Sequence, residues 1–293
     1  MIYDVSSTQG GSFMGRADGK RIKDAGLEYI VAAHIMARRT DATNFITLDI
    51  PLEPMRKYIN AKRKEGVRYS HQTVMFTSFV HTIARYPMLN NFVVNKRLYA
   101  RNEIAFGMVV LKDGKIDEVG TTDKMIFPKD ATIDEVNAII NSYIEKNRDQ
   151  SDVNSTDKAA NILCSVPGLL RFGVSVAKFM DKHNLLPKAL IDISPFHATM
   201  MFTNLASIHT NHVYHHIYDF GTTSLTLAMG QPHDVAVMKK GEITIQRCIP
   251  LGLAMDERIA SGSYFARAFQ YTLHLLENPE LLEQRPEITE DDI

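Results

Sequence analysis

The chain of 293 residues is long enough for one large domain, or two modest ones, with a well-buried core. Its 33 lysines and arginines are balanced by 34 aspartates and glutamates, and this balance argues against a nucleic acid or an anionic membrane surface as a partner. Two cysteines are too few for a disulfide framework and the N-terminal residues show no secretory signal, so the sequence predicts a cytoplasmic protein.

The first half of the chain predicts strands interleaved with helices. Residues 44–50 (NFITLDI) alternate in character as a strand does, whereas residues 55–66 (MRKYINAKRKEG) have the pattern of a basic amphipathic helix. Ser70 is suited to cap a second helix that ends before Pro87. Residues 103–120 predict a hairpin with an Asp-Gly turn.

The middle of the chain predicts two helices joined by a polar connection. Thr132 and Glu135 have the spacing of a capping box, which opens a helix to about residue 146. Residues 149–158 are polar and predict an exposed connection. Residues 159–183 predict a helical region that proline, glycine and charged residues interrupt too often for a membrane span.

The last third predicts strands followed by one long helix. Residues 199–208 and 222–230 have strand patterns, and residues 235–250 predict a hairpin that turns at residues 240–241. Residues 263–277 place apolar side chains on one stripe of a helix. Because the strands come largely in hairpins, we expect an α+β fold with an antiparallel or mixed sheet and helices on one face.

The segment at the end of the last hairpin carries the most informative motif. Residues 249–282 (IPLGLAMDERIASGSYFARAFQYTLHLLENPELL) resemble the C-terminal motif of the chloramphenicol acetyltransferase-like superfamily. They are most similar to the catalytic domain of dihydrolipoyl acyltransferases from 2-oxo acid dehydrogenase complexes. In that family a strand ends in Asp-His-Arg, two apolar residues and Asp-Gly follow, and the next helix ends in Leu-Glu-x-Pro-Glu-x-Leu.

Earlier segments resemble the same family in the same order, namely 84–92 (ARYPMLNNF), 102–120 and 199–208 (TMMFTNLASI). The resemblance begins near Arg38 and implies a two-layer α/β sandwich, a chloramphenicol acetyltransferase-like mixed sheet with helices packed on it. We expect one catalytic domain over residues 1–293, with 1–37 as an N-terminal extension or arm and no lipoyl domain.

The resemblance also implies roles for individual residues. In the family a motif histidine deprotonates the acceptor thiol, because a thiol with an ordinary pKa near 8.5 attacks only as its thiolate. Thr203 matches the hydroxyl that donates a hydrogen bond to the oxyanion of the tetrahedral intermediate. Glu257 stands at the histidine position, Ser261 at the motif aspartate, and Gly262 at the motif glycine. We therefore expect Thr203, Glu257 and Ser261 to be catalytic, Gly262 to contact the coenzyme, and the base to be non-standard.

Two interpretations of Glu257 stay open. A carboxylate with a pKa near 4.3 is a weak base for a thiol unless burial raises that pKa by about two units or more. Alternatively, Asp256, Glu257 and Arg258 form a structural charge cluster where a strand meets a helix.

The histidines that follow Thr203 offer a second candidate base. His215 or His216 can act as a relocated base if the loop brings either residue to Thr203; alternatively, both are ordinary loop histidines. His212 and His215 have a spacing that can chelate a metal, but no further metal-binding motif accompanies them, and no metal is predicted.

Arg38 and Arg39 are candidates to hold a coenzyme phosphate or a carboxylate, or else to pair within the fold. The first hypothesis is thus an acyltransferase that moves an acyl group between a coenzyme A thioester and a small-molecule thiol, hydroxyl or amine. Coenzyme A is then a substrate, no tightly bound cofactor is expected, and the resemblance implies a homotrimer with sites between subunits. The second hypothesis is a catalytically inactive relative that binds acyl-CoA or a protein partner.

Overall fold

A seven-stranded mixed sheet is the centre of the computed structural model, which describes residues 16–110, 121–148 and 168–289. Its order is β2-β10-β8-β7-β5-β6, and β9 pairs with β10. β7 is parallel to both β5 and β8, while the other neighbours are antiparallel. The strands are β2 (Thr43–Pro51), β5 (Ile104–Val110), β6 (Thr121–Phe127), β7 (Met200–Asn204), β8 (Leu225–Met229), β9 (His233–Lys239) and β10 (Glu242–Asp256).

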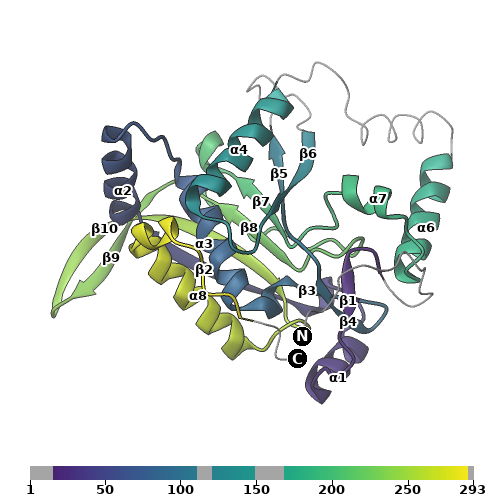
Figure 1. Cartoon of the computed structure of the whole chain (residues 1–293). Coiled ribbons are helices and arrows are strands. Elements are labelled where there is room, and N and C mark those ends of the chain that lie inside the picture. Colours follow the sequence, from purple (N-terminus) through teal and green to yellow (C-terminus); the bar gives the residue numbers. More distant parts are fainter. Residues whose placement is uncertain (1–15, 111–120, 149–167, 290–293) are drawn as a thin grey trace, which may run out of the picture.

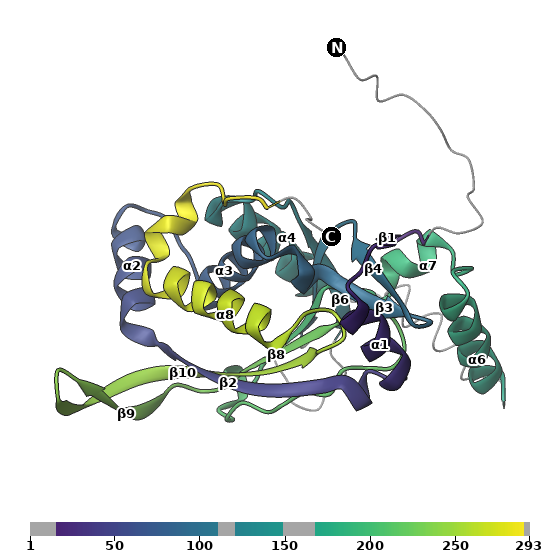
Figure 2. The same cartoon turned by 90° about the horizontal axis from the view of Figure 1, so that it is seen from below.

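Helices cover one face of this sheet (Figures 1 and 2). They are α2 (Leu52–Lys64), α3 (His71–Arg85), α4 (Ile133–Arg148) and α8 (Gly262–Glu277). Phe76 of the central helix α3 makes edge-to-face contacts with Phe106 and Phe202 on two neighbouring strands. Aromatic pairs of this kind stabilise a core beyond the area that they bury. The predicted α+β architecture with helices on one face is therefore confirmed.

A smaller unit lies at one end of the molecule (Figure 1). Three strands pair in the order β1-β4-β3, and the helices α1, α6 and α7 lie at this end as well. The elements are β1 (Gly19–Arg21), β3 (Asn91–Val94), β4 (Arg97–Arg101), α1 (Leu27–Ile35), α6 (Leu169–Lys182) and α7 (Lys188–Ile193). Short 3-10 turns cover 40–42, 87–90, 206–208 and 279–283.

Local signals placed most elements correctly. Ser70 caps α3 by accepting from the backbone N–H of Thr73, and the Thr73 hydroxyl accepts from the N–H of Ser70. Lys240 and Gly241 both have positive φ, as the turn of the β9–β10 hairpin requires. The Glu135 carboxylate accepts from the backbone N–H of Thr132, as predicted for the start of α4.

Some expectations fall elsewhere. β5 forms where the first strand of the hairpin over residues 103–120 was predicted, but its antiparallel partner β6 begins only at residue 121, beyond the predicted range. The expected turn at 113–114 lies outside the described residues. The polar connection 149–158 and residues 159–167 lie outside them as well. Residues 188–193, for which the sequence patterns predicted no helix or strand, form the short helix α7.

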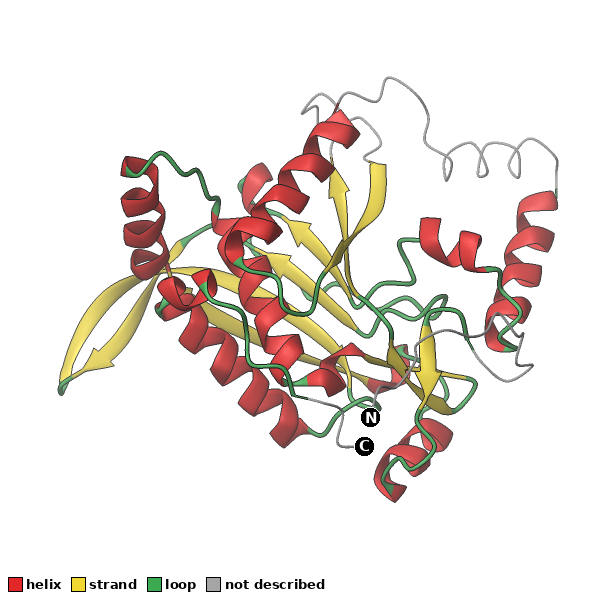
Figure 3. Cartoon of the chain, viewed as in Figure 1, coloured by secondary structure: helices red, strands yellow, loops and turns green. Residues whose placement is uncertain are grey.

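Part of the other face of the sheet is covered by irregular chain rather than by helices. The segment between β7 and β8 is almost wholly loop (Figure 3). A Cβ atom on Gly252 would lie 2.4 Å from the carbonyl oxygen of Val213, and one on Gly230 would lie 2.3 Å from the backbone nitrogen of His212. Residues 211–214 therefore lie directly against this face, which only glycine permits at these two positions. We call residues 211–214 the covering segment.

Candidate functional site

Thr203 lies near the C-terminal end of β7 and faces away from the helices. Its neighbour Phe202 is fully buried against Phe76, and side chains alternate along a strand, so Thr203 points toward the covering segment. The residue is half-buried, and its hydroxyl makes no hydrogen bond among the described residues. A half-buried hydroxyl without an internal partner is free to donate to a bound molecule.

A straight row of residues crosses the sheet from Thr203. Thr203 pairs with Ala228, Ala228 with Gly252, and Gly252 with Thr47 of β2. Neighbouring strands lie roughly 4.8 Å apart, so the row spans about 14 Å and all its side-chain positions share the face that the covering segment occupies. This row is the candidate site.

The three charges at the end of β10 separate into a buried pair and a lone carboxylate. Arg258 donates through Nε and Nη2 to the two carboxylate oxygens of Asp256, at 2.8 and 2.7 Å, and both side chains are almost wholly buried. Arg258 also donates through Nη1 to the carbonyl of Met36, 3.0 Å away. This bidentate pair holds the end of β10 to the segment that follows α1.

Glu257 does not join that pair. Its backbone N–H donates to Ala42, 2.9 Å away, and its half-buried carboxylate accepts a hydrogen bond from the side-chain amide of Asn44. Glu257 lies beyond Gly252 on β10, so it stands about 16 Å along the strand from the row that holds Thr203. A single chain therefore does not bring Glu257 to Thr203.

Ser261 and Gly262 form the start of α8. The hydroxyl of Ser261 accepts from the backbone N–H of Tyr264 at 3.3 Å, which makes this residue the helix cap. Gly262 is exposed, and a Cβ atom there would meet nothing within 4 Å. Both residues follow shortly after the C-terminal end of β10. They therefore lie near Glu257 rather than near Thr203.

His215 and His216 stack on each other, with ring centroids 4.6 Å apart. The carbonyl of His215 accepts from the Thr226 hydroxyl at 2.7 Å. Thr226 pairs with Met201, which is two residues before Thr203 on β7. The histidine pair therefore lies beside the neighbouring row of residues on the same face of the sheet.

The histidine whose backbone adjoins the Thr203 row is His212, which the sequence singled out only as a possible metal ligand. Its Nε2 lies 3.0 Å from Oγ1 of Thr47, at the far end of that row. The sequence alone could not have placed His212 beside this row, because the placement depends on Gly230, directly after β8, and on Gly252 of β10.

Arg38 and Arg39 have different surroundings. The Arg39 guanidinium is buried and donates to the carbonyls of Asp219 and Val93 at 3.2 and 2.9 Å. Burial lowers the pKa of Arg39 in spite of the nearby carboxylates. The exposed Arg38 pairs with Asp41 at 3.1 Å. Of these two arginines, Arg38 presents its charge to solvent and Arg39 does not.

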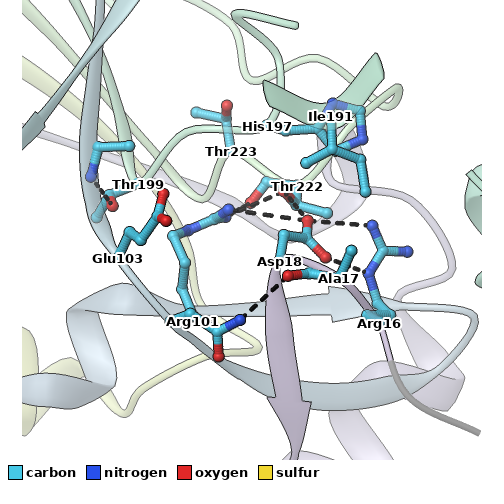
Figure 4. Close-up of polar contacts among 12 residues, drawn as sticks. Arg16, Ala17, Asp18, Arg101, Glu103, Ile191, His197, Thr199, Thr222 and Thr223 are labelled. Atoms are coloured by element: carbon cyan, nitrogen blue, oxygen red, sulfur yellow. Dashed lines mark hydrogen bonds and ion pairs between the residues drawn. The ribbon is translucent and has the colours of Figure 1, made fainter. Parts of the chain in front are cut away.

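A buried polar cluster supports the beginning of β7. Figure 4 shows Arg16 and Arg101 on opposite sides of Asp18, with Arg16 at 2.8 Å and Arg101 at 3.9 Å. Arg101 also donates to the carbonyl of Thr222 at 2.7 Å. Burial lowers the pKa of Arg101 to about 10, so the guanidinium stays charged at neutral pH. The cavity beside it, of about 20 Å³, has room for one water molecule and is too small for a substrate.

Asp181 and His197 complete this cluster. Arg16 donates to Asp181 at 2.7 Å, and Nε2 of His197 lies 3.3 Å from the same carboxylate oxygen. Burial by itself would raise the pKa of Asp181, but the hydrogen bond from His197 and the charge of Arg16 outweigh burial and lower that pKa to about 2. Burial lowers the pKa of His197. A neutral His197 thus donates to an ionised Asp181, and the cluster is structural.

Two further properties concern the described residues only. They contain no group of three or more histidine, cysteine or acidic side chains arranged to hold a metal ion. Of their helices, none has both the length and the apolar character needed to cross a bilayer.

Comparison with known proteins identifies the fold. Residues 197–283 match the family model of the 2-oxoacid dehydrogenases acyltransferase catalytic domain, whereas no curated protein sequence matches the chain. A probable dihydrolipoamide acetyltransferase from Listeria monocytogenes is similar in structure, with a TM-score of 0.56 and 13% identity over 88% of this chain and 94% of that one. A truncated catalytic core of the 2-oxoacid dehydrogenase multienzyme complex from Thermoplasma acidophilum gives 0.52 and 13%, over 89% and 99%. A chloramphenicol acetyltransferase gives 0.53 and 10%, over 88% and 99%.

These similarities confirm the resemblance inferred from residues 249–282. The chain has the chloramphenicol acetyltransferase-like fold, and its C-terminal part matches the acyltransferase catalytic domain. The matched part contains Thr203, the covering segment and Glu257.

Proposed function

We propose that this protein is an acyltransferase that moves an acyl group between a coenzyme A thioester and a small-molecule thiol, hydroxyl or amine. The observation that carries the proposal is the placement of Thr203. Thr203 is half-buried, its hydroxyl has no internal hydrogen bond among the described residues, and it lies in the segment that matches the family model. The resemblance of residues 199–208 to the family implies that this hydroxyl is the oxyanion donor. Coenzyme A acts as a substrate, and the base differs from the motif histidine because Glu257 occupies that position.

Acyl transfer needs a hydrogen-bond donor for the oxyanion and a general base for the acceptor. As the acceptor attacks the thioester carbonyl, a negative charge develops on the oxygen, and the Thr203 hydroxyl stabilises that charge through a hydrogen bond. A preorganised donor of this kind accelerates the reaction because it bonds more strongly to the oxyanion than to the ground-state carbonyl.

We further propose a homotrimer in which the Glu257 end of one subunit approaches Thr203 of the next. This arrangement is supported by the separation of about 16 Å along the sheet, which rules out contact of the two residues within one chain. The exposed apolar side chains of the projecting β9–β10 hairpin also favour contact with another copy; they are Met238, Ile243 and Ile245, each about 70% exposed.

In such an assembly Ser261, Gly262 and the exposed Arg38 are available to the coenzyme. We also propose that the chain acts as one catalytic domain, with residues 1–37 as an extension, and that it works in the cytoplasm. His215 and His216 stay secondary candidates for the base, since they lie close to the row of Thr203.

The alternative is a catalytically inactive relative that binds acyl-CoA or a protein partner. This alternative is favoured by Glu257, since a half-buried carboxylate bonded to Asn44 replaces the base of the family.

The test is the release of coenzyme A from a panel of short and branched acyl-CoA donors with thiol, alcohol and amine acceptors. We expect turnover by the wild type and a fall of about 10²- to 10³-fold in kcat for Thr203→Ala, with thioester binding retained. Ser175→Ala, which removes an exposed hydroxyl on α6, is the matched control and should keep full activity. Glu257→Gln tests the carboxylate as base.

The outcomes separate the candidates. Coenzyme A binding without turnover on any donor supports the inactive relative. Turnover that is unchanged in Thr203→Ala removes Thr203 from the mechanism, and the absence of both binding and turnover contradicts the proposal.

A further inference from the structure

A groove lies at the end of the molecule where α1 meets the three-stranded sheet (Figure 1). One wall is α1, and the other consists of the β3–β4 turn and the residues that follow β1. Its volume is about 300 Å³, at the lower end of the range for small-molecule sites. The groove is therefore large enough for a small ligand, unlike the water-sized cavity beside Arg101.

The floor of this groove is apolar. Tyr29 and Ala33 lie one helical turn apart, so their side chains share one face of α1. Ile22 and Leu98 continue the floor, and the backbone N–H of Ile22 donates to the carbonyl of Leu98 at 3.0 Å. Tyr29 is half-buried, so part of its ring is open to the groove. The floor can thus receive the flat apolar part of a ligand.

Cations form the rim of the groove. They are the exposed side chains of Arg21, Lys23, Lys96 and Arg97. None of the four makes an ion pair or a side-chain hydrogen bond with another described residue. Among the described residues no carboxylate lines the groove, and the carboxylate of Glu28 lies instead against Gly26. A concave surface that carries charges of one sign attracts a ligand of the opposite sign.

Regular structure holds three of these cations in place. Asn95 and Lys96 have φ values of 48° and 62°, as the tight turn of a hairpin requires, and Arg97 pairs with Val94 across that hairpin. Arg21 pairs with Tyr99 of β4. Charges that are already positioned lose less freedom when a ligand binds, which favours binding.

We infer that this groove binds a nucleotide, with the rim cations on its phosphates and its base against Tyr29. An arginine fork matches two phosphate oxygens and a lysine acts as a point charge, so four cations suit a ligand with two or more phosphates. Any nucleobase has a flat face that stacks on an aromatic ring. The inference concerns binding alone and does not rest on the proposed acyl transfer.

Two kinds of molecule carry this chemistry. One is a free nucleotide. The other is coenzyme A, whose adenosine end is phosphorylated. The groove lies close to the Glu257 end of the chain, because α1 leads to Met36, whose carbonyl accepts from Arg258. Either source would place phosphates on the same rim, so the experiment has to separate them.

The test is calorimetric titration of the wild type with ADP, pyrophosphate and coenzyme A. We expect ADP to bind, and Lys23→Gln combined with Arg97→Gln to raise its Kd by about 10- to 100-fold, because charge-assisted contacts are lost. Arg63→Gln combined with Lys64→Gln removes two exposed charges from the end of α2 and is the matched control, which should leave the Kd unchanged. Tyr29→Leu should raise the Kd of ADP but not that of pyrophosphate, which has no base.

The outcomes are distinct once circular dichroism shows that each variant is folded. ADP that competes with coenzyme A supports the groove as the site of the adenosine end of the coenzyme, whereas ADP that binds without competing supports a separate nucleotide. A wild type that binds neither ADP nor pyrophosphate overturns the inference. An equal Kd for ADP in the wild type and in the Lys23→Gln, Arg97→Gln protein overturns it as well. Neither of these results touches the proposed acyltransferase, which the release of coenzyme A tests separately.

Discussion

The Asp256–Arg258 pair holds the end of β10 against residues that are distant in the sequence. Both charges are buried, and Arg258 also reaches the carbonyl of Met36. Removing one partner of a buried ion pair leaves the other charge without compensation, which costs far more than losing a surface pair.

We therefore expect Asp256→Asn to lower the free energy of unfolding by about 3–5 kcal/mol, measured by urea denaturation. The matched control is Asp234→Asn, which removes one carboxylate of the exposed Asp234–Arg247 pair on the β9–β10 hairpin and should change stability little. If the two variants lowered the free energy of unfolding equally, burial of the Asp256–Arg258 pair would not explain its contribution to stability.

His197 should make the stability of the fold depend on pH. Burial lowers its pKa below the ordinary 6.5, so below pH 6.5 the unfolded chain binds a proton that the folded chain does not. The free energy of unfolding must then fall as the pH drops through that range. Asp181 acts at lower pH: its pKa of about 2 contributes stability above about pH 4 that is lost as the pH falls toward 2.

The measurement is urea denaturation at pH 7 and pH 5.5 for the wild type and for His197→Gln. We expect the variant to be less stable at pH 7 but to lose less stability between the two pH values, because it has no imidazole to protonate at position 197. Burial also lowers the pKa of His71 and of His81, but both residues are present in both proteins and cancel in the comparison. If both proteins lost the same free energy of unfolding between pH 7 and pH 5.5, His197 would not be the source of this pH dependence.

At the scale of elements, the covering segment is held against the sheet by the lack of side chains at Gly230 and Gly252. We expect Gly252→Ala to destabilise the protein by about 1–3 kcal/mol, because the new methyl group would meet the carbonyl of Val213 at 2.4 Å. Gly262→Ala adds the same methyl group where nothing lies within 4 Å, so its melting temperature should be close to that of the wild type. A stable Gly252→Ala protein would show that the covering segment moves freely.

Local sequence signals predicted the elements better than they predicted the site. The cap at Ser70 and the turn at Lys240 depend on neighbouring residues only, and both could be read from the sequence. The location of His212 depends on strands β2, β8 and β10, which a pattern along the chain cannot place beside the covering segment. The motif placed Asp256, Glu257 and Arg258 in a possible charge cluster, but it could not show that Glu257 bonds instead to Asn44, which is distant in the sequence.

At the scale of the whole molecule, the fold class followed from the order of strands and from the family resemblance, whereas the assembly did not. The β9–β10 hairpin projects from the body with exposed apolar side chains (Figure 2). We expect the wild type to sediment as a trimer, and Ile243→Lys with Ile245→Lys to shift it toward smaller species while the monomer stays folded. Thr244→Lys, between them on the same strand, is the control for added charge. A wild type that sediments only as a monomer would contradict the trimer.

The central claim is that acyl transfer takes place beside Thr203, on the face of the sheet that carries none of the described helices. The most direct measurement is a crystal structure of the wild type with coenzyme A bound. We expect the thiol of the pantetheine arm to lie beside the half-buried Thr203, in reach of its hydroxyl. Coenzyme A bound with its sulfur remote from Thr203 would contradict the claim.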